Sequence, residues 1–224
     1  MRVVHVFSRY HVLRVRGAVA AVLLGLGLGL GVGLGVAPVQ ALDRLDIVVA
    51  GGSEDLTRAV QEASQLRSLQ VLGQTDPQDL LAAARADYAR ILAAMYARGH
   101  YSVVIRIRID GREAADFAAV DAPDAIRTIR IEVHPGPRFT FGKARMKPYA
   151  PGTELPPDYR DTLIARSTAI QEAARAGVEG WRQLGHAKAA VAGENIVADH
   201  RARTVDSEIL LEAGPRLRFG RLRL

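Results

Sequence analysis

The sequence predicts an α+β protein in which one β-α-α-β-β unit occurs twice in tandem. The string "GPRFTFG" at Gly136–Gly142 recurs as "GPRLRFG" at Gly214–Gly220. The dipeptide "GH" stands at Gly99–His100 and again at Gly185–His186, each time between a helix-like and a strand-like segment. Repetition at a fixed order of elements indicates copies of one supersecondary unit.

The first unit, residues 42–135, begins with a strand and two helices. "RLDIVVAG" alternates apolar residues at Leu45, Ile47 and Val49, which is typical of a strand. Ser53 is placed to cap a helix, and Asp76 followed by Pro77 is placed to start a second one. We expect Gly99 to end that second helix in the left-handed conformation.

Two strands complete the first unit. "YSVVIRIRID" predicts a strand over Tyr101–Ile109 that presents isoleucines on one face and Val104, Arg106 and Arg108 on the other. After a loop over residues 110–123, "IRTIRIEV" predicts the last strand. The expected core of this unit contains Ile47, Leu81, Ile91, Ile105 and Ile131.

The second unit, residues 136–215, repeats this order. "RFTFGKARM" predicts its first strand and "PPDYRDTLIA" a short helix. Thr168 and Gln171 have capping-box spacing at the start of a longer helix. "HAKAAV" and "TVDSEILLEAG" predict the closing strands. The expected core contains Phe141, Ile170, Trp181 and Ile209.

The last residues, 216–224, predict the first strand of a third unit that the sequence does not include. A lone strand cannot bury itself, so the chain is expected to be the N-terminal piece of a longer protein. The alternative is that this strand pairs back onto the second unit.

Residues 1–41 have the pattern of a secretory signal peptide. Four arginines precede an uncharged apolar run, Gly17–Ala37, and "VQA" at residues 39–41 has the small residues of a cleavage site. The alternative is a retained anchor, because the run is long enough to span a membrane. Either leader predicts export, and its removal lowers the formal net charge from +6 to +2.

Composition excludes several classes of function. A residual charge of +2 and export argue against a nucleic-acid partner. The absence of cysteine excludes disulfides and thiolate metal sites, and is compatible with a bacterial periplasm. His100, His134, His186 and His200 lack metal-ligand spacing, and Glu113, Asp121 and Asp124 lack the order of a calcium loop. We therefore expect no cofactor, no metal and no enzyme activity.

Strand edges remain as the expected means of binding. The edges of an open sheet offer unpaired N–H and C=O groups to another extended chain. The candidate partner-binding residues are Tyr101, Val104, Arg106 and Arg108, with the strand at residues 187–191 as the corresponding element of the second unit. The arginines are equally explained as a guard against aggregation.

Tandem β-α-α-β-β units behind a leader, joined by "GPRFTFG" and "GPRLRFG", with "ARGHYSVVIRI" after the long helix, resemble POTRA domains of the outer-membrane barrel assembly superfamily. The "GHYS" string resembles the Gly-aromatic-aromatic turn at the end of the second POTRA helix, with His100 departing at one position. The "GHAKAAV" string has no aromatic residue at His186 or Ala187, so the second unit departs further. The resemblance implies POTRA-like domains, each with a three-stranded mixed sheet covered by two helices.

The same resemblance implies a location and partners. The short first unit and the "AGPRLRFG" joint are most similar to the branch of the superfamily that inserts autotransporters. That branch implies a scaffold on the periplasmic face of the outer membrane, bound to unfolded outer-membrane or autotransporter clients, to a periplasmic or inner-membrane assembly partner, and to its own C-terminal barrel. The alternative is an inner-membrane-anchored POTRA protein of division or secretion, with an exported enzyme as a distant third.

Overall fold

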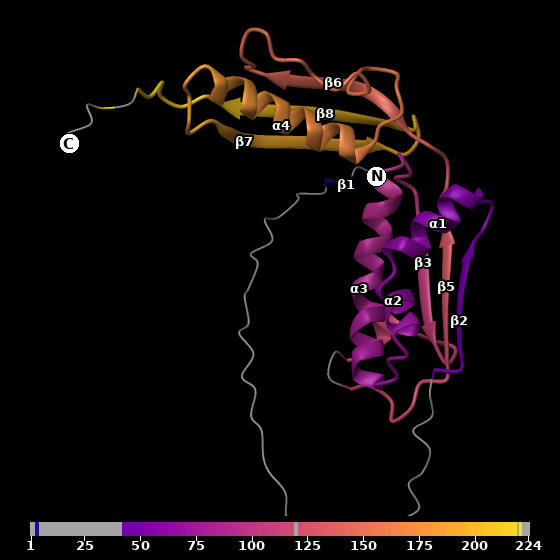
Figure 1. The fold of residues 1–224 in the computed structure, drawn as a ribbon. Coiled ribbons are helices and arrows are strands. Elements are labelled where there is room, and N and C mark those ends of the chain that lie inside the picture. The colour runs from indigo at the N-terminus through magenta and orange to yellow at the C-terminus, as the bar shows by residue number, and fades with distance from the viewer. Residues whose placement is uncertain (1–2, 5–41, 119–120, 219, 221–224) are drawn as a thin grey trace, which may run out of the picture.

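The computed structural model describes residues 3–4, 42–118, 121–218 and 220, which form two α+β units that meet at an angle (Figure 1). We call the part from residue 42 to 135 unit one and the part from 136 to 215 unit two. Each unit has its own sheet and its own buried cluster of apolar side chains.

The described residues of unit one form three helices and four strands. In chain order they are β2 (Arg44–Val49), α1 (Glu54–Ala63), α2 (Gln65–Val71), α3 (Pro77–Tyr96), β3 (Val104–Ile109), β4 (Arg112–Glu113) and β5 (Thr128–His134), with a short 3-10 turn, η1, at Ala114–Asp116. The sheet order is β2-β5-β3-β4, with β2 parallel and β3 antiparallel to β5. The sheet is therefore mixed, with the last predicted strand at its centre.

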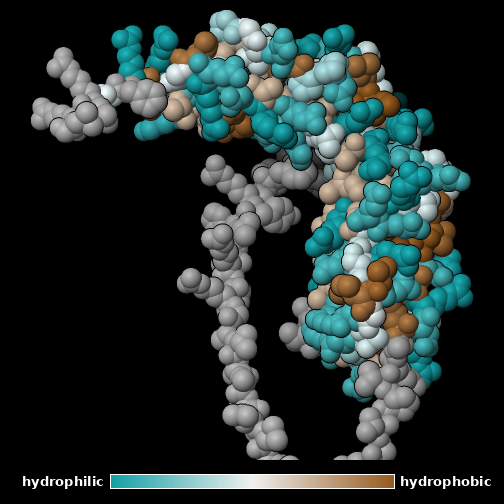
Figure 2. Space-filling model, in the orientation of Figure 1, coloured by the Kyte–Doolittle hydropathy of each residue, from teal (hydrophilic) through white to brown (hydrophobic). Residues whose placement is uncertain are grey.

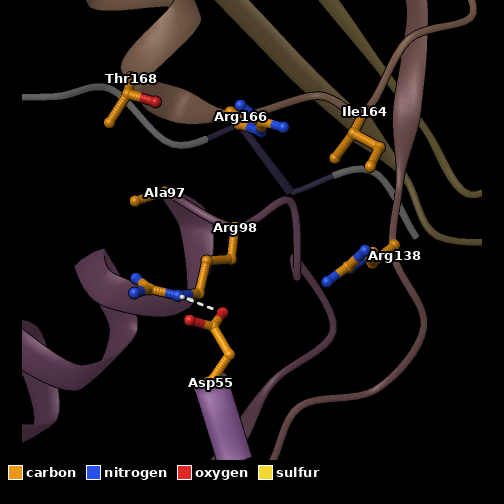
Figure 3. A pocket seen from close by; sticks show the side chains of 7 residues that line it. All are labelled: Asp55, Ala97, Arg98, Arg138, Ile164, Arg166 and Thr168. Atoms are coloured by element: carbon orange, nitrogen blue, oxygen red, sulfur yellow. Dashed lines mark ion pairs between the residues drawn. The ribbon is translucent and has the colours of Figure 1, made fainter. Parts of the chain in front are cut away.

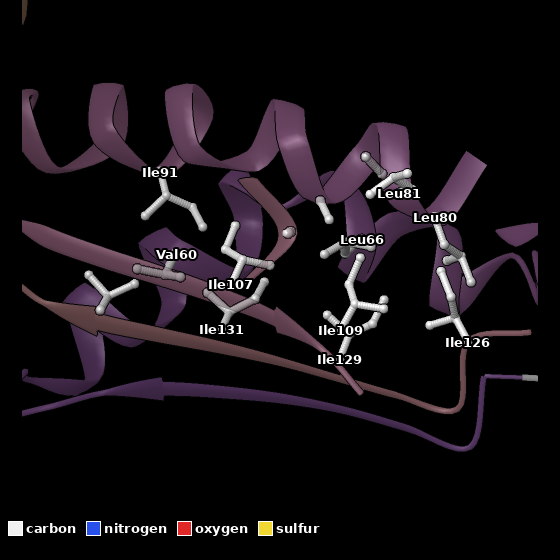
Figure 4. Packing of buried hydrophobic residues seen from close by; sticks show 14 of the residues in the cluster. Val60, Leu66, Leu80, Leu81, Ile91, Ile107, Ile109, Ile126, Ile129 and Ile131 are labelled. Atoms are coloured by element: carbon white, nitrogen blue, oxygen red, sulfur yellow. The ribbon is translucent and has the colours of Figure 1, made fainter. Parts of the chain in front are cut away.

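The core of unit one lies between the helices and one face of the sheet (Figure 4). Leu81, Ile91 and Ile131 are fully buried as predicted, whereas Ile47, on the outer strand β2, and Ile105, at the start of β3, are only partly buried. A fully buried isoleucine or leucine stabilises the fold by about 1.5–3 kcal/mol.

A buried carboxylate explains why the first predicted helix is divided in two. Asp87 of α3 accepts hydrogen bonds from Ser64 Oγ at 2.6 Å, from the Gln65 amide at 2.7 Å and from the Leu66 amide at 3.2 Å. These amides are the unpaired donors at the start of α2, so Asp87 caps that helix from a neighbouring one. The two caps predicted for this unit, Ser53 and Asp76, are confirmed.

Unit two contains β6 (Thr140–Lys147), α4 (Ser167–Gln183), β7 (Ala190–Asp199) and β8 (Thr204–Glu212). Strand β8 lies at the centre, parallel to β6 and antiparallel to β7. The short strand β1 (Val3–Val4) pairs with the outer edge of β7. Phe141, Ile170 and Ile209 are buried as predicted, and Trp181 is partly buried against the same cluster.

Three local predictions in unit two are wrong. "PPDYRDTLIA" forms turns instead of a helix, and its end runs along the start of β6, where the Phe141 amide donates to the Leu163 carbonyl at 2.8 Å. Helix α4 begins at Ser167 after Arg166, with no side-chain cap, so Thr168 and Gln171 form no capping box. Strand β7 begins at Ala190, because the alanine-rich segment before it has low strand propensity.

Both units nevertheless share one topology: β2 and β3 flank β5 in unit one, and β6 and β7 flank β8 in unit two. The α+β class with mixed sheets is therefore confirmed. Most of the predicted leader lies outside the described residues. So does most of the predicted third-unit strand, of which residues 216–218 and 220 are described and form no strand.

The face of the molecule seen in Figure 2 is mostly hydrophilic, and apolar groups gather on it in several separate places. The most exposed large apolar side chains are Val71 and Leu72, at the end of α2. Within the described ranges, no helix combines the length and apolar character needed to span a membrane.

Candidate functional site

The outer edge of β3, the first predicted binding edge, is largely occupied by its own unit. Strand β4 pairs with Arg108 and Ile109, and the Glu113 carboxylate accepts from the Ile107 amide at 3.0 Å. Since N–H groups alternate along a strand, the outward-facing amides are those of Ile105, Ile107 and Ile109. Among the described residues, only Ile105 is left with unpaired outward groups on this strand.

Tyr88 of α3 closes the same edge from the helix side. Its hydroxyl donates to the Glu113 carboxylate and lies 3.3 Å from the Ile107 carbonyl oxygen. Burial, as the largest cause, and then the hydrogen bond to Glu113 raise the pKa of Tyr88 to about 12. The hydroxyl therefore remains a donor at any physiological pH.

Arg106 and Arg108 lie on the sheet face opposite the helices. Arg108 lies 3.1 Å from Glu132, and Arg130 lies 2.7 Å from the same carboxylate. The hydrogen bond from Arg130 is the main cause that lowers the pKa of Glu132, and the charges of Arg108 and Arg106 add to it. This face thus presents three arginines around one glutamate.

Tyr101 and Val104 do not form part of the open edge. Tyr101 stacks on Tyr96 with ring centres 4.7 Å apart and lies 5.6 Å from the ring of Phe139, so it fills the contact between the units. Burial raises the pKa of Tyr101 well above its usual value. Val104 is half exposed, but its main-chain groups face His134 of β5.

The outer edge of β7 is the longest open edge in the described part of the chain. It is unpaired there from Ala190 to Ile196, and next to this stretch Val197 and Ala198 pair antiparallel with Val4 and Val3. The outer edge of β6 is covered instead: Ala165 donates to the Phe139 carbonyl at 3.0 Å, and the Asp161 carboxylate accepts from the Ala144 amide at 2.8 Å.

The edge of β2 is also open, but it spans only six residues and carries the Arg44–Asp46 ion pair. Charges on an edge strand disfavour pairing with another chain.

The sequence alone gives a weak signal for β7, because "GENIVAD" begins with residues of low strand propensity. The alternation of Ile196 and Ala198 was the available signal.

Each "GH" string contacts the "GPR" string that follows it, so the same contact occurs twice. We call the first of the two, between residues 99–102 and 136–139, the joint, because it links unit one to unit two. The Phe139 amide donates to the Gly99 carbonyl at 2.8 Å, and the Leu217 amide donates to the Gly185 carbonyl at the same distance. A Cβ atom on Gly99, whose φ is +81°, would lie 2.7 Å from Ile164. The close approach of the two units therefore requires glycine there.

Ser102 and His200 add a polar contact across the joint. Ser102 Oγ lies 2.9 Å from His200 Nδ1, and the His200 ring packs edge-on against Phe139. Ser102 is paired with His200 and not with His100, and this contact joins unit one to unit two. Within the described residues, no group of three His, Asp or Glu side chains is placed to hold a metal ion.

Neither a protein-family model nor a curated protein sequence matches the chain. Among solved structures, it is similar to POTRA domains 3–5 of BamA from Haemophilus influenzae, with 14% identity, coverage of 81% of this chain and 71% of that one, and a TM-score of 0.45. It is also similar to POTRA domains 1–2 of the periplasmic domain of Omp85 from Anabaena, with 13% identity, coverage of 78% and 96%, and a TM-score of 0.40.

A third similar structure is the N-terminal domain of Omp85 from Thermosynechococcus elongatus. Here the identity is 16%, the coverage is 75% of this chain and 61% of that one, and the TM-score is 0.37.

Proposed function

We propose that this chain is a periplasmic scaffold region of an outer-membrane protein insertion machine, and that it holds client or partner polypeptides by strand addition. The observation that carries this proposal is the open outer edge of β7 from Ala190 to Ile196. Main-chain groups along such an edge supply the affinity for an added strand, and alternate side chains supply the selectivity.

The pairing of β1 with β7 supports the choice of this edge. Val3 and Val4 lie opposite Ala198 and Val197 in antiparallel register. An extended segment from elsewhere in the sequence thus pairs with the outer edge of β7. An unfolded client would occupy the neighbouring stretch in the same manner.

The edge of β3 serves as a shorter second contact in this proposal. In the described part of the chain, only the main-chain groups of Ile105 are free there, and the exposed Arg106 and the half-buried Arg108 lie beside them. Ile105→Pro removes an outward N–H, whereas Val104→Pro removes one that faces His134 inside the sheet. We expect Ile105→Pro to fold and Val104→Pro to weaken the sheet.

The signal peptide, the bounds of the domains and the type of subunit are proposals drawn from the sequence motifs. We assign residues 1–41 to a signal peptide, residues 42–135 and 136–215 to POTRA-like domains, and the whole chain to a TamA-like subunit for autotransporter assembly. The Leu217–Gly185 bond, which repeats the Phe139–Gly99 bond, supports a third unit after residue 215. A barrel beyond it follows only from the resemblance.

Crosslinking in cells tests the binding edge. A photoreactive residue at Glu194 or Asn195 of β7 should capture an extended polypeptide, and one at Lys143 of the covered strand β6 should not. Capture from Lys143 alone would move the site away from β7.

Sequencing the mature N-terminus separates the two explanations of the leader. A start at Leu42 supports the signal peptide, and an intact Met1 supports an inner-membrane anchor.

A further inference from the structure

A hollow of about 390 Å³ lies beside the joint, between unit one and unit two (Figure 3). Arg98 and Asp55 line it from unit one, and Ile164, Arg166 and Thr168 line it from unit two. Arg138, which belongs to the joint, also lines the hollow, and its side chain points toward the side where Arg98 lies. The volume of the hollow is within the usual range of small-molecule sites.

The charge of the hollow is unbalanced. Three arginines line it and Asp55 is the only carboxylate among the lining residues, which leaves a formal charge of +2. The Arg98–Asp55 pair is 3.5 Å long, and Arg166 lies 3.5 Å from Asp158, outside the hollow. Pairs of this length between part-exposed groups contribute little, so both guanidinium groups keep the capacity to bind another anion.

Arg138 is an exposed side chain whose guanidinium group is open to a ligand. Within the described residues, no carboxylate or other acceptor lies within hydrogen-bond distance of its guanidinium group. Three arginines around one hollow make the electrostatic potential there positive, which favours an anion. Arginine forks match the oxygens of carboxylates and phosphates in pairs.

The start of α4 adds donors on the unit-two side. Arg166 is the N-cap of α4 and makes no side-chain capping bond, and its carbonyl accepts the first main-chain bonds of the helix, from the amides of Ala169 and Ile170. The amides of Ser167 and Thr168 therefore remain available, and the positive end of a 17-residue helix favours a negative charge there.

We propose that this hollow binds a small oxyanion with two negative charges, of the phosphate or dicarboxylate class. The anion bonds Arg138 and Arg98 from one side and Arg166 with the start of α4 from the other. Because the donors come from both units, the bound anion fastens unit one to unit two. This site is separate from the β7 edge, so its failure would leave the proposed function untouched.

The test is a titration of the purified protein with inorganic phosphate and with succinate, at an ionic strength held constant with sodium chloride. We expect saturable shifts of the Ser167 and Thr168 amide resonances with at least one of these probes, and a rise of Tm with its concentration. Arg138→Gln should weaken binding about tenfold, since a charge-assisted pair is lost. Arg175→Gln removes the same charge from an exposed position of α4 and is the matched control.

Saturation by phosphate alone identifies a tetrahedral anion, and saturation by succinate alone identifies a dicarboxylate. Either outcome supports the site if Arg138→Gln weakens it and Arg175→Gln does not. Non-saturating shifts with both probes, equal to those with chloride, would overturn the proposal. Equal weakening by the two variants would do the same, because it would show general attraction to a positive surface.

Discussion

The Nδ1 atom of His100 lies 3.0 Å from the carbonyl oxygen of Gly136, and the Nδ1 atom of His186 lies 2.8 Å from that of Gly214. A carbonyl oxygen only accepts, so each ring donates from Nδ1. The "GH" and "GPR" strings are therefore the two halves of one contact that the chain builds twice. This contact fixes the turn after each long helix to the segment that leaves the sheet.

His100→Ala should lower the free energy of unfolding by about 1–3 kcal/mol, because a buried ring and its hydrogen bond are both lost. Only about 5% of His100 is exposed. Chemical denaturation of the variant measures the loss. His134→Ala, at an exposed position at the end of β5, should change stability by less than about 0.5 kcal/mol. Equal losses in the two variants would contradict the role of His100.

Asp87→Ala should cost about 3–5 kcal/mol, since it leaves the Ser64 hydroxyl and the Gln65 and Leu66 amides unpaired in the interior. Asp87→Asn retains one acceptor oxygen and should cost less. Denaturation midpoints give both values, and Glu62→Ala on the exposed side of α1 serves as the control. A cost for Asp87→Ala below 1 kcal/mol would show that the cap is dispensable.

Ile107→Asp should unfold unit one at a lower temperature than unit two. Ile107 is fully buried in the core of unit one, and an unpaired carboxylate there is strongly destabilising. Calorimetry should show two transitions, of which the unit-two transition moves little. A common shift of the whole molecule would mean that the two units form one cooperative body.

Arg145→Gln should raise the pKa of Asp161 toward its ordinary value of 3.8. Two hydrogen bonds of 2.7 Å from Arg145 are the main cause that lowers this pKa, and the Ala144 amide adds to it. A lowered carboxyl pKa stabilises the fold above 3.8, and this contribution is lost as the pH falls through the folded value. Carbon-detected NMR titration of Asp161 measures the change, and an unchanged pKa would contradict the assignment.

Much of the fold is predictable because its signals are local. Ser53 and Asp76 are capping residues next to apolar periodicity, and both cap helices in the structure. The alternation over Val104–Ile109 gives the correct faces of β3, with Ile107 and Ile109 buried. Gly99 has the positive φ that its place after a helix requires.

The features that sequence reasoning missed depend on contacts between distant residues. Asp87 caps α2 from 21 to 23 positions away, and no local pattern marks such a partner. Glu113 lies in a loop without the order of a calcium site and has no other sequence signal, yet it covers the edge of β3. In "PPDYRDTLIA", bonds from Tyr159 to β6 and β8 and from Arg145 to Asp161 replace the predicted helix.

Hydrogen exchange of the purified protein, with and without a denatured outer-membrane barrel protein, tests the central claim most directly. We predict slower exchange of the amides of β7 between Ala190 and Ile196, no change in β6, and at most a local change at Ile105. Because amides alternate along a strand, Glu194 and Asn195 contribute one outward N–H between them, and the proline variant that removes it should weaken this protection. Lys143→Pro on the covered strand is the comparison for general damage to the sheet. Protection that is absent from β7, or that appears equally on β6, would contradict strand addition at this edge.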